Sequence, residues 1–285
     1  MSKKILVTGA TGTIGKAVVK ELKAAGAAFK AASRNVAAGH DKLGSDTEVV
    51  AFDFVDPTTF NAATEGVDRV FLLGPPLTLE LDKLLAPFIA HLQTKGIKRV
   101  VYFSALGAEK MGDSLGFHTL IEEQLKRENF DYTILKPTFF AQNFKNYEWE
   151  NITERGITFV TAGKGKAAFV DVNDIAKVAA KVLTTDGHIG KHYQLTGPEL
   201  LSYAEAAQIL TEVTGKPIFY PNPSPDQYRG ALAAAGAPAF VADYMINVYS
   251  IIATNEAALL TSDVELLTGQ KPTDLKTVLQ RDFAA

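Results

Sequence analysis

The sequence of 285 residues contains no cysteine, no long apolar run and no excess of positive charge. Without cysteine, disulfides, thiol nucleophiles and cysteine-held metals are excluded. The formal net charge of −3 argues against sequence-independent binding of nucleic acid, which depends on Lys and Arg. The first apolar run ends at Gly9, too short for a signal peptide, and no segment is long enough to span a bilayer. The five histidines show no ligand spacing, so we expect a cytoplasmic protein with no metal, no membrane partner and no nucleic-acid partner.

The N-terminus contains a strand, a glycine turn and a helix in that order. Residues 4–8 form a short apolar run rich in branched side chains, typical of a buried parallel strand. Gly9, Gly12 and Gly15 follow at intervals of three, and residues 16–25 have the apolar spacing of an amphipathic helix. Gly9 suits a tight turn, Gly12 lets a pyrophosphate approach the backbone, and Gly15 lets the helix pack closely on the sheet. The segment predicts a phosphate cradle for a dinucleotide, with a purely structural turn as the alternative.

Strands and helices alternate along the rest of the chain. We expect strands at 28–33, 48–52, 69–73, 99–104, 132–135 and 192–196, and helices at 79–95, 118–128, 174–183, 203–214 and 228–260. Such alternation builds a parallel sheet covered on both faces. The predicted fold is α/β: a Rossmann doubly wound parallel sheet with a smaller C-terminal α/β lobe. Residues 1–137 would form the NAD(P)-binding domain, with a return to the sheet at about 168–197, and residues 138–285 the smaller substrate-binding lobe.

The residues after the second strand distinguish NADP from NAD. In this fold an acidic residue there binds the ribose hydroxyls of NAD, but this strand ends at Ser33 and Arg34, with no carboxylate before Asp41. The planar guanidinium of Arg34 can neutralise a 2′-phosphate and lie over the adenine, so NADP is favoured over NAD. A solvated loop arginine is the alternative. Asp53, at the end of the third strand, could accept the adenine amino group or cap a turn with Asp56.

Four segments, in the same order, resemble the NmrA-like branch of atypical short-chain dehydrogenase/reductases. They are VTGATGTIG at 7–15, VVYFSALG at 100–107, YTILKPTFFAQNF at 132–144 and FVDVNDIA at 169–176. The likeness covers nearly the whole chain. Within the branch, the sequence is most similar to the bacterial NAD(P)H-dependent quinone oxidoreductases and triphenylmethane dye reductases.

The resemblance implies a cofactor site along the carboxyl ends of the strands, where open α/β sheets bind ligands. The residues implied for the phosphates and adenosine are Gly9, Thr11, Gly12, Thr13, Ile14, Gly15, Ser33 and Arg34. Those implied for the ribose and nicotinamide are Leu73, Gly74, Pro75, Ser104, Pro137, Thr138 and Phe139.

The sequence departs from the wider family at the catalytic pair. Most short-chain dehydrogenases carry Tyr-x-x-x-Lys after the fifth strand, and the lysine lowers the tyrosine pKa for proton exchange with the substrate. The corresponding positions here are Ser114 and His118. We expect His118 to donate a proton or to bind the nicotinamide ribose, unless it is simply a buried or surface histidine. Glu122, one helical turn further, is expected to hold the imidazole by an i,i+4 contact.

The missing pair favours acceptors that need no positioned acid. Hydride addition to a quinone leaves a mildly basic phenolate, and addition to a cationic dye leaves a neutral product. Orientation of the nicotinamide alone can supply several kcal/mol for such a reaction. We therefore predict NADPH-dependent reduction of an electrophilic, planar aromatic acceptor such as a quinone or dye. The candidates for the acceptor pocket are Phe140, Phe144, Trp149 and Tyr228, although aromatic residues at this spacing are also typical of a core.

Two other functions remain open from the sequence. NmrA-like proteins include non-catalytic NAD(P)-binding redox sensors that regulate a protein partner, and a sensor would also lack the Tyr/Lys pair. Imine reduction is a third possibility that needs no tyrosine acid. The compact C-terminal lobe and its aromatic segment favour the reductase. The sequence does not distinguish a monomer from a homodimer.

Overall fold

The computed structural model describes residues 4–283, which divide into two compact units. The first unit consists of residues 4–105, Phe117–Lys136 and Val172–Tyr193. Its sheet has seven strands in the order β3-β2-β1-β4-β5-β6-β8, and the pairings from β3 through β6 are parallel. The strands are β1 (Lys4–Val7), β2 (Phe29–Ser33), β3 (Val49–Ala51), β4 (Val67–Leu72), β5 (Arg99–Phe103), β6 (Asp131–Pro137) and β8 (Lys191–Leu195). The predicted Rossmann α/β fold is confirmed.

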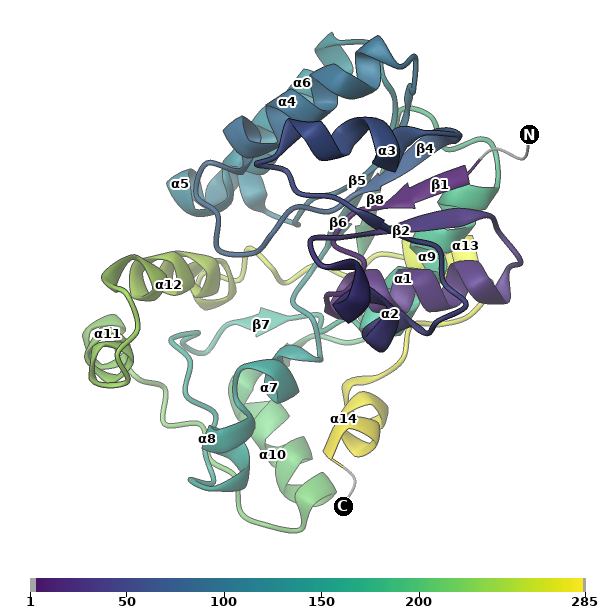
Figure 1. Ribbon diagram of the computed structural model, residues 1–285. Helices are drawn as coiled ribbons and strands as arrows, with labels where there is room; N and C mark the ends of the chain where they lie inside the picture. The colour runs from purple at the N-terminus through teal and green to yellow at the C-terminus, as the bar shows by residue number, and fades with distance from the viewer. Residues whose placement is uncertain (1–3, 284–285) are drawn as a thin grey trace. The chain divides into compact units, whose positions relative to one another are not determined.

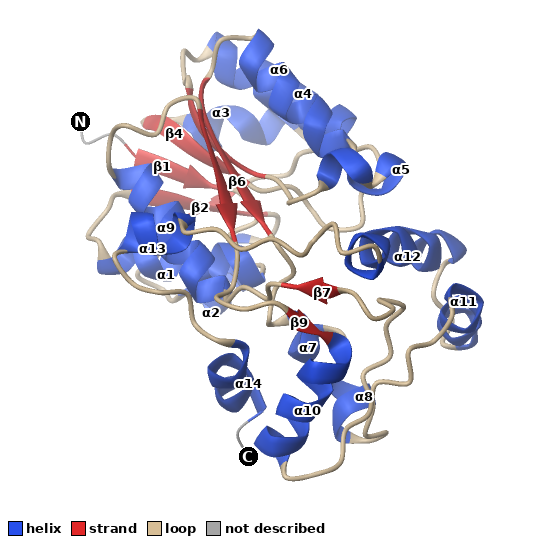
Figure 2. Cartoon of the chain, turned by 180° about the vertical axis from the view of Figure 1, so that it is seen from behind, coloured by secondary structure: helices blue, strands red, loops and turns tan. Residues whose placement is uncertain are grey.

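Helices cover both faces of this sheet, as Figures 1 and 2 show. α1 (Thr13–Ala24) packs against α9 (Val172–Thr184) on one face, and α4 (Leu81–Thr94) packs against α6 (Phe117–Arg127) on the other. The shorter helices of this unit are α2 (Val36–Leu43), η1 (Pro57–Thr59) and α3 (Phe60–Thr64). Because both faces are covered, β1 has no polar face: Ile5, Leu6 and Val7 are all buried.

Two arginine side chains on the sheet bind the C-terminal end of α9, a helix that is distant from them in sequence. Arg69 on β4 donates to the carbonyl of Leu183 (2.6 Å), and Arg99 on β5 donates to that of Thr185 (2.5 Å). Arg99 also pairs with Asp186 at 2.9 Å. The carbonyls at a helix C-terminus lack partners within the helix and carry partial negative charge, so these cations hold the C-terminal end of α9.

The second unit consists of Leu106–Gly116, Pro137–Asp171 and residues 194–283. The segment 106–116 belongs to it, which a single boundary at residue 137 does not anticipate. Its elements are η2 (Ala108–Lys110), α5 (Gly112–Leu115), α7 (Asn143–Asn146), α8 (Trp149–Thr153), β7 (Lys166–Ala167), β9 (Leu201–Ser202), α10 (Tyr203–Thr214), α11 (Pro225–Ala234), α12 (Ala239–Ala253), α13 (Asp263–Thr268) and α14 (Leu275–Phe283). β7 and β9 pair antiparallel. Ser202 and Glu205 form the predicted capping box of α10.

An ion pair between a partly exposed arginine and a buried carboxylate holds α14 within the second unit. Arg281 donates through both terminal nitrogens to the carboxylate of Asp171, at 2.9 and 3.1 Å, and the side chain of Gln142 donates to the same carboxylate at 2.9 Å. Asp171 is buried. A bidentate arginine satisfies both oxygens of a carboxylate that would otherwise be costly to bury.

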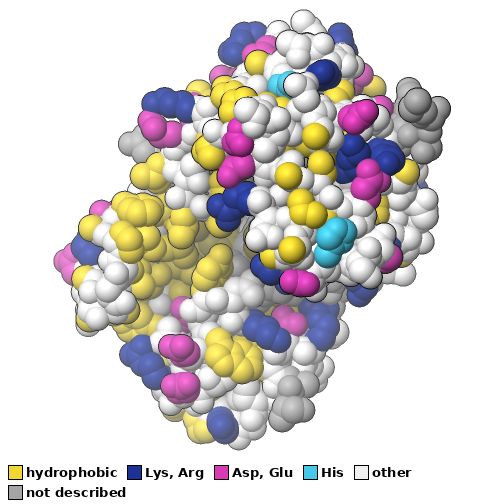
Figure 3. Space-filling view, viewed as in Figure 1, with side chains coloured by type: hydrophobic (Ala, Val, Ile, Leu, Met, Phe, Trp, Pro, Cys, Tyr) yellow, Lys and Arg dark blue, Asp and Glu magenta, His cyan; other side chains and the backbone are white. Residues whose placement is uncertain are grey.

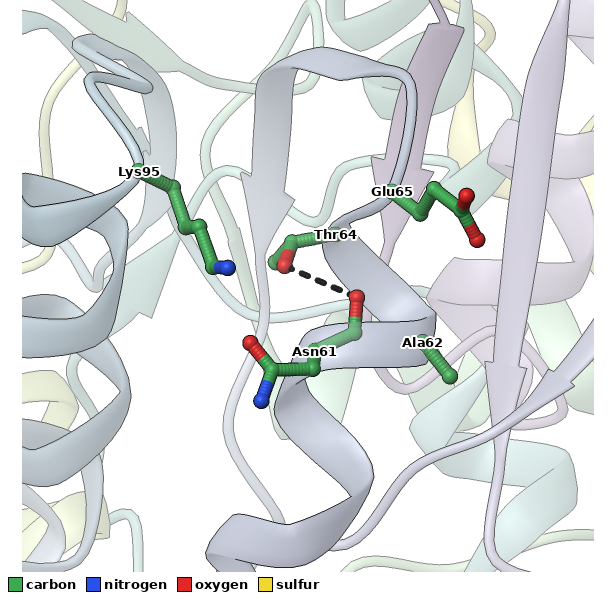
Figure 4. Close-up of a pocket in the computed structure, with 5 residues that line it drawn as sticks. All are labelled: Asn61, Ala62, Thr64, Glu65 and Lys95. Atoms are coloured by element: carbon green, nitrogen blue, oxygen red, sulfur yellow. Dashed lines mark hydrogen bonds between the residues drawn. The ribbon is translucent and has the colours of Figure 1, made fainter.

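A shallow polar pocket lies at the amino ends of β4 and β5. Figure 4 shows its lining: Asn61, Ala62, Thr64, Glu65 and Lys95. Ligands of doubly wound sheets bind at the carboxyl ends of the strands, so this pocket is at the opposite end from the predicted cofactor site. Within residues 4–283, no helix is long and apolar enough to cross a membrane, and no cluster of three metal-ligating side chains occurs.

Candidate active site

The glycine turn between β1 and α1 is tightest at Gly15, where only a glycine fits. Gly9 has a positive φ of 61°, and the backbone N–H of Gly12 donates to its carbonyl at 3.0 Å. A Cβ on Gly15 would lie 2.1 Å from the oxygen of Gly9 and 2.6 Å from Cα of Ala10. The absence of a side chain at Gly15 therefore allows the close contact between α1 and the turn.

The N-terminus of α1 fits the pyrophosphate of a dinucleotide. Gly12 is the N-cap, and as a glycine it contributes no side-chain cap to the helix. Gly12 and Thr13 are exposed, Thr11 is half-buried, and the side chain of Ile14 is buried. Backbone N–H groups and the positive end of a helix dipole together form an anion site. The N-terminal end of α1 therefore has the geometry and the partial positive charge that suit a phosphate group.

Arg34 follows β2 as an exposed side chain. It makes no hydrogen bond or ion pair with the residues that the structure describes. Its neighbours are engaged in the turn: the hydroxyl of Ser33 donates to the carbonyl of Asn35 at 2.7 Å, and the side chain of Asn35 caps α2 by accepting from Ala38 N at 3.0 Å. Arg34 is thus the residue of this turn that can bind an anionic ligand.

Asp53 lies in the turn after β3. Its carboxylate accepts from the N–H of Val55 at 3.2 Å, and Asp53 and Asp56 form an isolated bridge. The turn role is therefore present in the structure, while a contact with adenine stays a prediction.

Thr8, which the sequence reasoning did not single out, ties the ends of β1 and β4 together. Its hydroxyl donates to the carbonyl of Leu73 (2.9 Å) and accepts from the N–H of the same residue (2.8 Å). A Cβ on Gly74 would lie 2.5 Å from Cδ1 of Leu81, so glycine lets Leu81 pack closely there. Pro75 is exposed. The segment predicted to lie along the ribose is thereby fixed beside the glycine turn. The role of Thr8 could have been predicted from its position, since it is a polar residue at the end of an apolar strand.

The predicted contact between Glu122 and His118 is wrong. Ser104 donates from its hydroxyl to Oε1 of Glu122 at 2.6 Å, and Nζ of Lys136 lies 2.8 Å from Oε2. Both oxygens of the carboxylate therefore bind groups at the ends of β5 and β6. The i,i+4 spacing places two residues on one helix face, but the stronger partners of Glu122 are on the sheet.

His118 instead binds Tyr102, with 2.6 Å between Nδ1 and the hydroxyl. Burial lowers the pKa of His118 to about 4, and the charge of Lys136 acts in the same direction. Burial also raises the pKa of Tyr102 well above its usual value, as does the charge of Glu122. Tyr102 therefore stays protonated at neutral pH. A neutral His118 is suited to hydrogen bonding; its contact with cofactor or substrate stays a prediction.

The residues after β6 belong to the second unit. Pro137 ends the strand, and the backbone N–H of Thr138 donates to the carbonyl of Leu195 at 3.0 Å. The hydroxyl of Thr138 donates to the carbonyl of Ala168. The ring of Phe139 stacks on Tyr249, with centroids 6.1 Å apart. These contacts fix the backbone of Thr138 and the ring of Phe139.

The four predicted pocket aromatics do not share one environment. Phe144 is 2% exposed and packs against Phe169 and Tyr203, which leaves no ring surface for an acceptor. Phe144 is therefore a core residue, which is the alternative that its spacing allowed. Trp149 is 44% exposed and stacks on Phe283 of α14. The remaining two are Phe140, which is half-buried and bridges to Val170, and Tyr228, which is buried and stacks on Phe159.

The sequence pattern of the NAD(P)H-binding family matches residues 9–186. The chain belongs to this family. The NAD(P)H azoreductase of Xenophilus azovorans is 34% identical over 271 residues, which cover 93% of each chain.

Solved structures extend the likeness to the whole chain. Triphenylmethane reductase from Citrobacter sp., complexed with NADP(H), is 30% identical, with a TM-score of 0.87 over 98% of this chain and 99% of that chain. The NADPH-dependent quinone oxidoreductase from Escherichia coli, complexed with NADPH, is 26% identical, with a TM-score of 0.88 over 98% and 99%. The resemblance to NmrA-like atypical short-chain dehydrogenase/reductases is confirmed.

Proposed function

We propose that this protein is an NADPH-dependent oxidoreductase that transfers hydride to an electrophilic, planar aromatic acceptor such as a quinone or dye. The observation that carries the proposal is the glycine turn at the N-terminus of α1, together with an exposed Arg34 that forms no ion pair with residues 4–283. The names of similar proteins support the proposal: they are an azoreductase, a triphenylmethane reductase and a quinone oxidoreductase.

In this proposal each end of the cofactor has its own residues. The N–H groups of α1 bind the pyrophosphate, and Arg34 binds the 2′-phosphate. Leu73, held by Thr8, and Ser104 lie at the strand ends that would take the nicotinamide half. NADPH, when bound, supplies the hydride; these residues hold it in place and orient it.

The polar groups beside Ser104 favour an acceptor that needs no strong acid. His118 is neutral at neutral pH and Tyr102 is a weaker acid than a free tyrosine, because burial shifts both pKa values against ionisation. A ketone would need a positioned acid for its alkoxide. A quinone or a cationic or azo dye does not, so orientation can carry the reaction.

The second unit has exposed apolar surface of its own. Figure 3 shows hydrophobic side chains gathered over α12. Phe240 on this helix is 44% exposed, and Tyr244, Met245 and Ile246 are half-buried. An exposed apolar patch of this kind on a folded unit is typical of a binding surface. Its side chains match the flat apolar faces of a quinone or dye.

The test is the absorbance of NADPH with purified protein and a panel of acceptors. The panel contains a benzoquinone, a naphthoquinone, a triphenylmethane dye and an azo dye, with NADH in parallel. We expect NADPH oxidation that needs both protein and acceptor. Binding of NADPH without oxidation by any acceptor would reject the reductase and favour the redox sensor.

Arg34→Ala tests the choice of cofactor. We expect the preference for NADPH over NADH to fall roughly 10- to 100-fold, since a hydrogen bond to a charged group is worth about 1.5–3 kcal/mol. The measurement is kcat/KM for both cofactors with one acceptor. Lys42→Ala removes an exposed cation from neighbouring α2 and serves as the control for net charge. An equal loss with NADPH and NADH would place Arg34 on the adenine instead of the 2′-phosphate.

A further inference from the structure

Three polar side chains from three elements form one chain of contacts at the carboxyl ends of β5 and β6. Ser104 follows β5, Glu122 is on α6, and Lys136 is on β6. Ser104 is 2% exposed, and the side chains of Glu122 and Lys136 are 11% and 18% exposed. A buried ion pair is weak evidence for stability, because desolvation offsets its attraction. Its position at the ligand-binding edge of the sheet points to another role.

The carboxylate fixes the direction of the hydrogen bond at Ser104. A carboxylate only accepts hydrogen bonds, and the other oxygen of Glu122 forms an ion pair with Lys136 at 2.8 Å. The hydroxyl of Ser104 must therefore donate to Glu122, at 2.6 Å. The N–H of Ser104 is also engaged, donating to the carbonyl of Leu135 at 2.9 Å. Ser104 can therefore still accept a hydrogen bond from another group through its Oγ.

We propose that Glu122 and Lys136 are positioning residues that hold Ser104 Oγ as a hydrogen-bond acceptor for the nicotinamide half of the cofactor. The partner is a neutral donor, either the carboxamide NH2 or a ribose hydroxyl. The inference rests on the proposed function, since it needs NADPH at this edge of the sheet. It assigns to Glu122 an action through Ser104 and no direct contact with the reacting atoms.

Glu122→Gln is the informative substitution because it keeps the shape and reverses the hydrogen bond. An amide NH2 facing the ammonium of Lys136 would be repelled, so Gln places its carbonyl toward Lys136 and its NH2 toward Ser104. Ser104 then accepts from Gln, and its own proton points at the donor of the cofactor. We expect the Kd for NADPH to rise about 10-fold or more, the range for a buried polar group that loses its partner.

A double-mutant cycle with Ser104→Ala separates positioning from a merely structural role. We expect each single variant to raise the Kd for NADPH, measured by NADPH fluorescence, and the double variant to raise it no further than Ser104→Ala alone. Glu123→Gln, an exposed neighbour on α6, is the matched control and should leave the Kd unchanged.

Several results would overturn the inference. If Glu122→Gln weakens NADPH binding equally with and without the Ser104 hydroxyl, Glu122 acts through the fold and not through Ser104. If all variants bind NADPH like the parent, Ser104 has no cofactor contact. Failure of the parent itself to bind NADPH rejects the proposed function, a separate result.

A cofactor analogue identifies the donor. The 3-acetylpyridine analogue of NADPH has a methyl ketone in place of the carboxamide and so lacks the NH2 group. If the coupling between Glu122 and Ser104 disappears with this analogue, the donor is the carboxamide. If the coupling persists, the donor is a ribose hydroxyl. Both results support the positioning role and decide between its two partners.

Discussion

Replacing Gly12 with valine is expected to weaken NADPH binding by at least about 100-fold, or about 2.7 kcal/mol, while the chain stays folded. Gly12 has extended backbone, φ −82° and ψ 176°, which any residue adopts. A Cβ there would meet only the oxygen of Gly9, at 3.4 Å. The fold therefore accepts a side chain at Gly12. The proposed pyrophosphate does not, because the side chain would project beside the N-terminal end of α1, where the pyrophosphate would bind.

The measurement pairs an NADPH fluorescence titration with thermal unfolding. Gly12→Val should lose affinity with little change in Tm. Gly15→Ala should lose both, because its Cβ would lie 2.1 Å from the oxygen of Gly9 and overpacking costs about 1–3 kcal/mol. Gly230→Ala, with open space around it inside α11, is the control: it should leave the affinity unchanged and raise the Tm slightly, because alanine favours a helix over glycine by about 1 kcal/mol. Unchanged affinity in Gly12→Val would remove the pyrophosphate from this turn.

The glycine turn and the sheet could be predicted because their signals are local. Apolar runs of strand length, glycines at fixed spacing and helical periodicity each reflect the geometry of a single element. The chain order then limits how those elements pair, since parallel strands need crossover connections. The predicted return of the chain to the sheet is likewise present, as α9 and β8.

The errors concern contacts between elements distant in sequence. Helical spacing placed Glu122 beside His118, but could not show that Ser104 and Lys136 lie closer to its carboxylate. Segment 106–116 precedes the predicted boundary at residue 137, and its Met111 is buried among residues of the second unit. Aromatic spacing likewise could not separate buried Phe144 from exposed Trp149. Such outcomes depend on tertiary packing, which no single element encodes.

The two units each bury a titratable side chain, with opposite consequences for stability. His118 in the first unit has its pKa lowered to about 4, because burial disfavours the imidazolium. The unfolded chain then binds more protons between about pH 4 and 6.5, so this residue lowers stability as the pH falls through that window. Glu148 in the second unit has its pKa raised to about 7, because burial disfavours the carboxylate. Glu148 therefore lowers stability as the pH rises, whereas His118 lowers it as the pH falls.

Glu148 keeps this raised pKa despite hydrogen bonds that favour the charged form. Oε2 accepts from the N–H of Phe159 at 2.6 Å and from the side chain of Asn151 at 3.2 Å, and the charge of Arg155 also lowers the pKa. Burial outweighs all three. Between about pH 4.5 and 7 the folded chain holds a proton that the unfolded chain has released. The free energy of unfolding therefore falls as the pH rises through this window.

Glu148→Gln is expected to remove this loss, because the amide is neutral at every pH and keeps an oxygen for Phe159 and Asn151. At about pH 8 the variant should be more stable than the parent by up to about 3 kcal/mol, at 1.36 kcal/mol per pKa unit. At about pH 4.5 the gain should disappear, since the carboxyl is then protonated in the folded chain. Urea unfolding at both pH values measures the difference, and comparison with the parent cancels the contribution of His118. Glu150→Gln, an exposed neighbour on α8, should show no pH-dependent gain. A Glu148→Gln variant less stable than the parent at both pH values would mean that Glu148 is ionised and stabilised by Arg155.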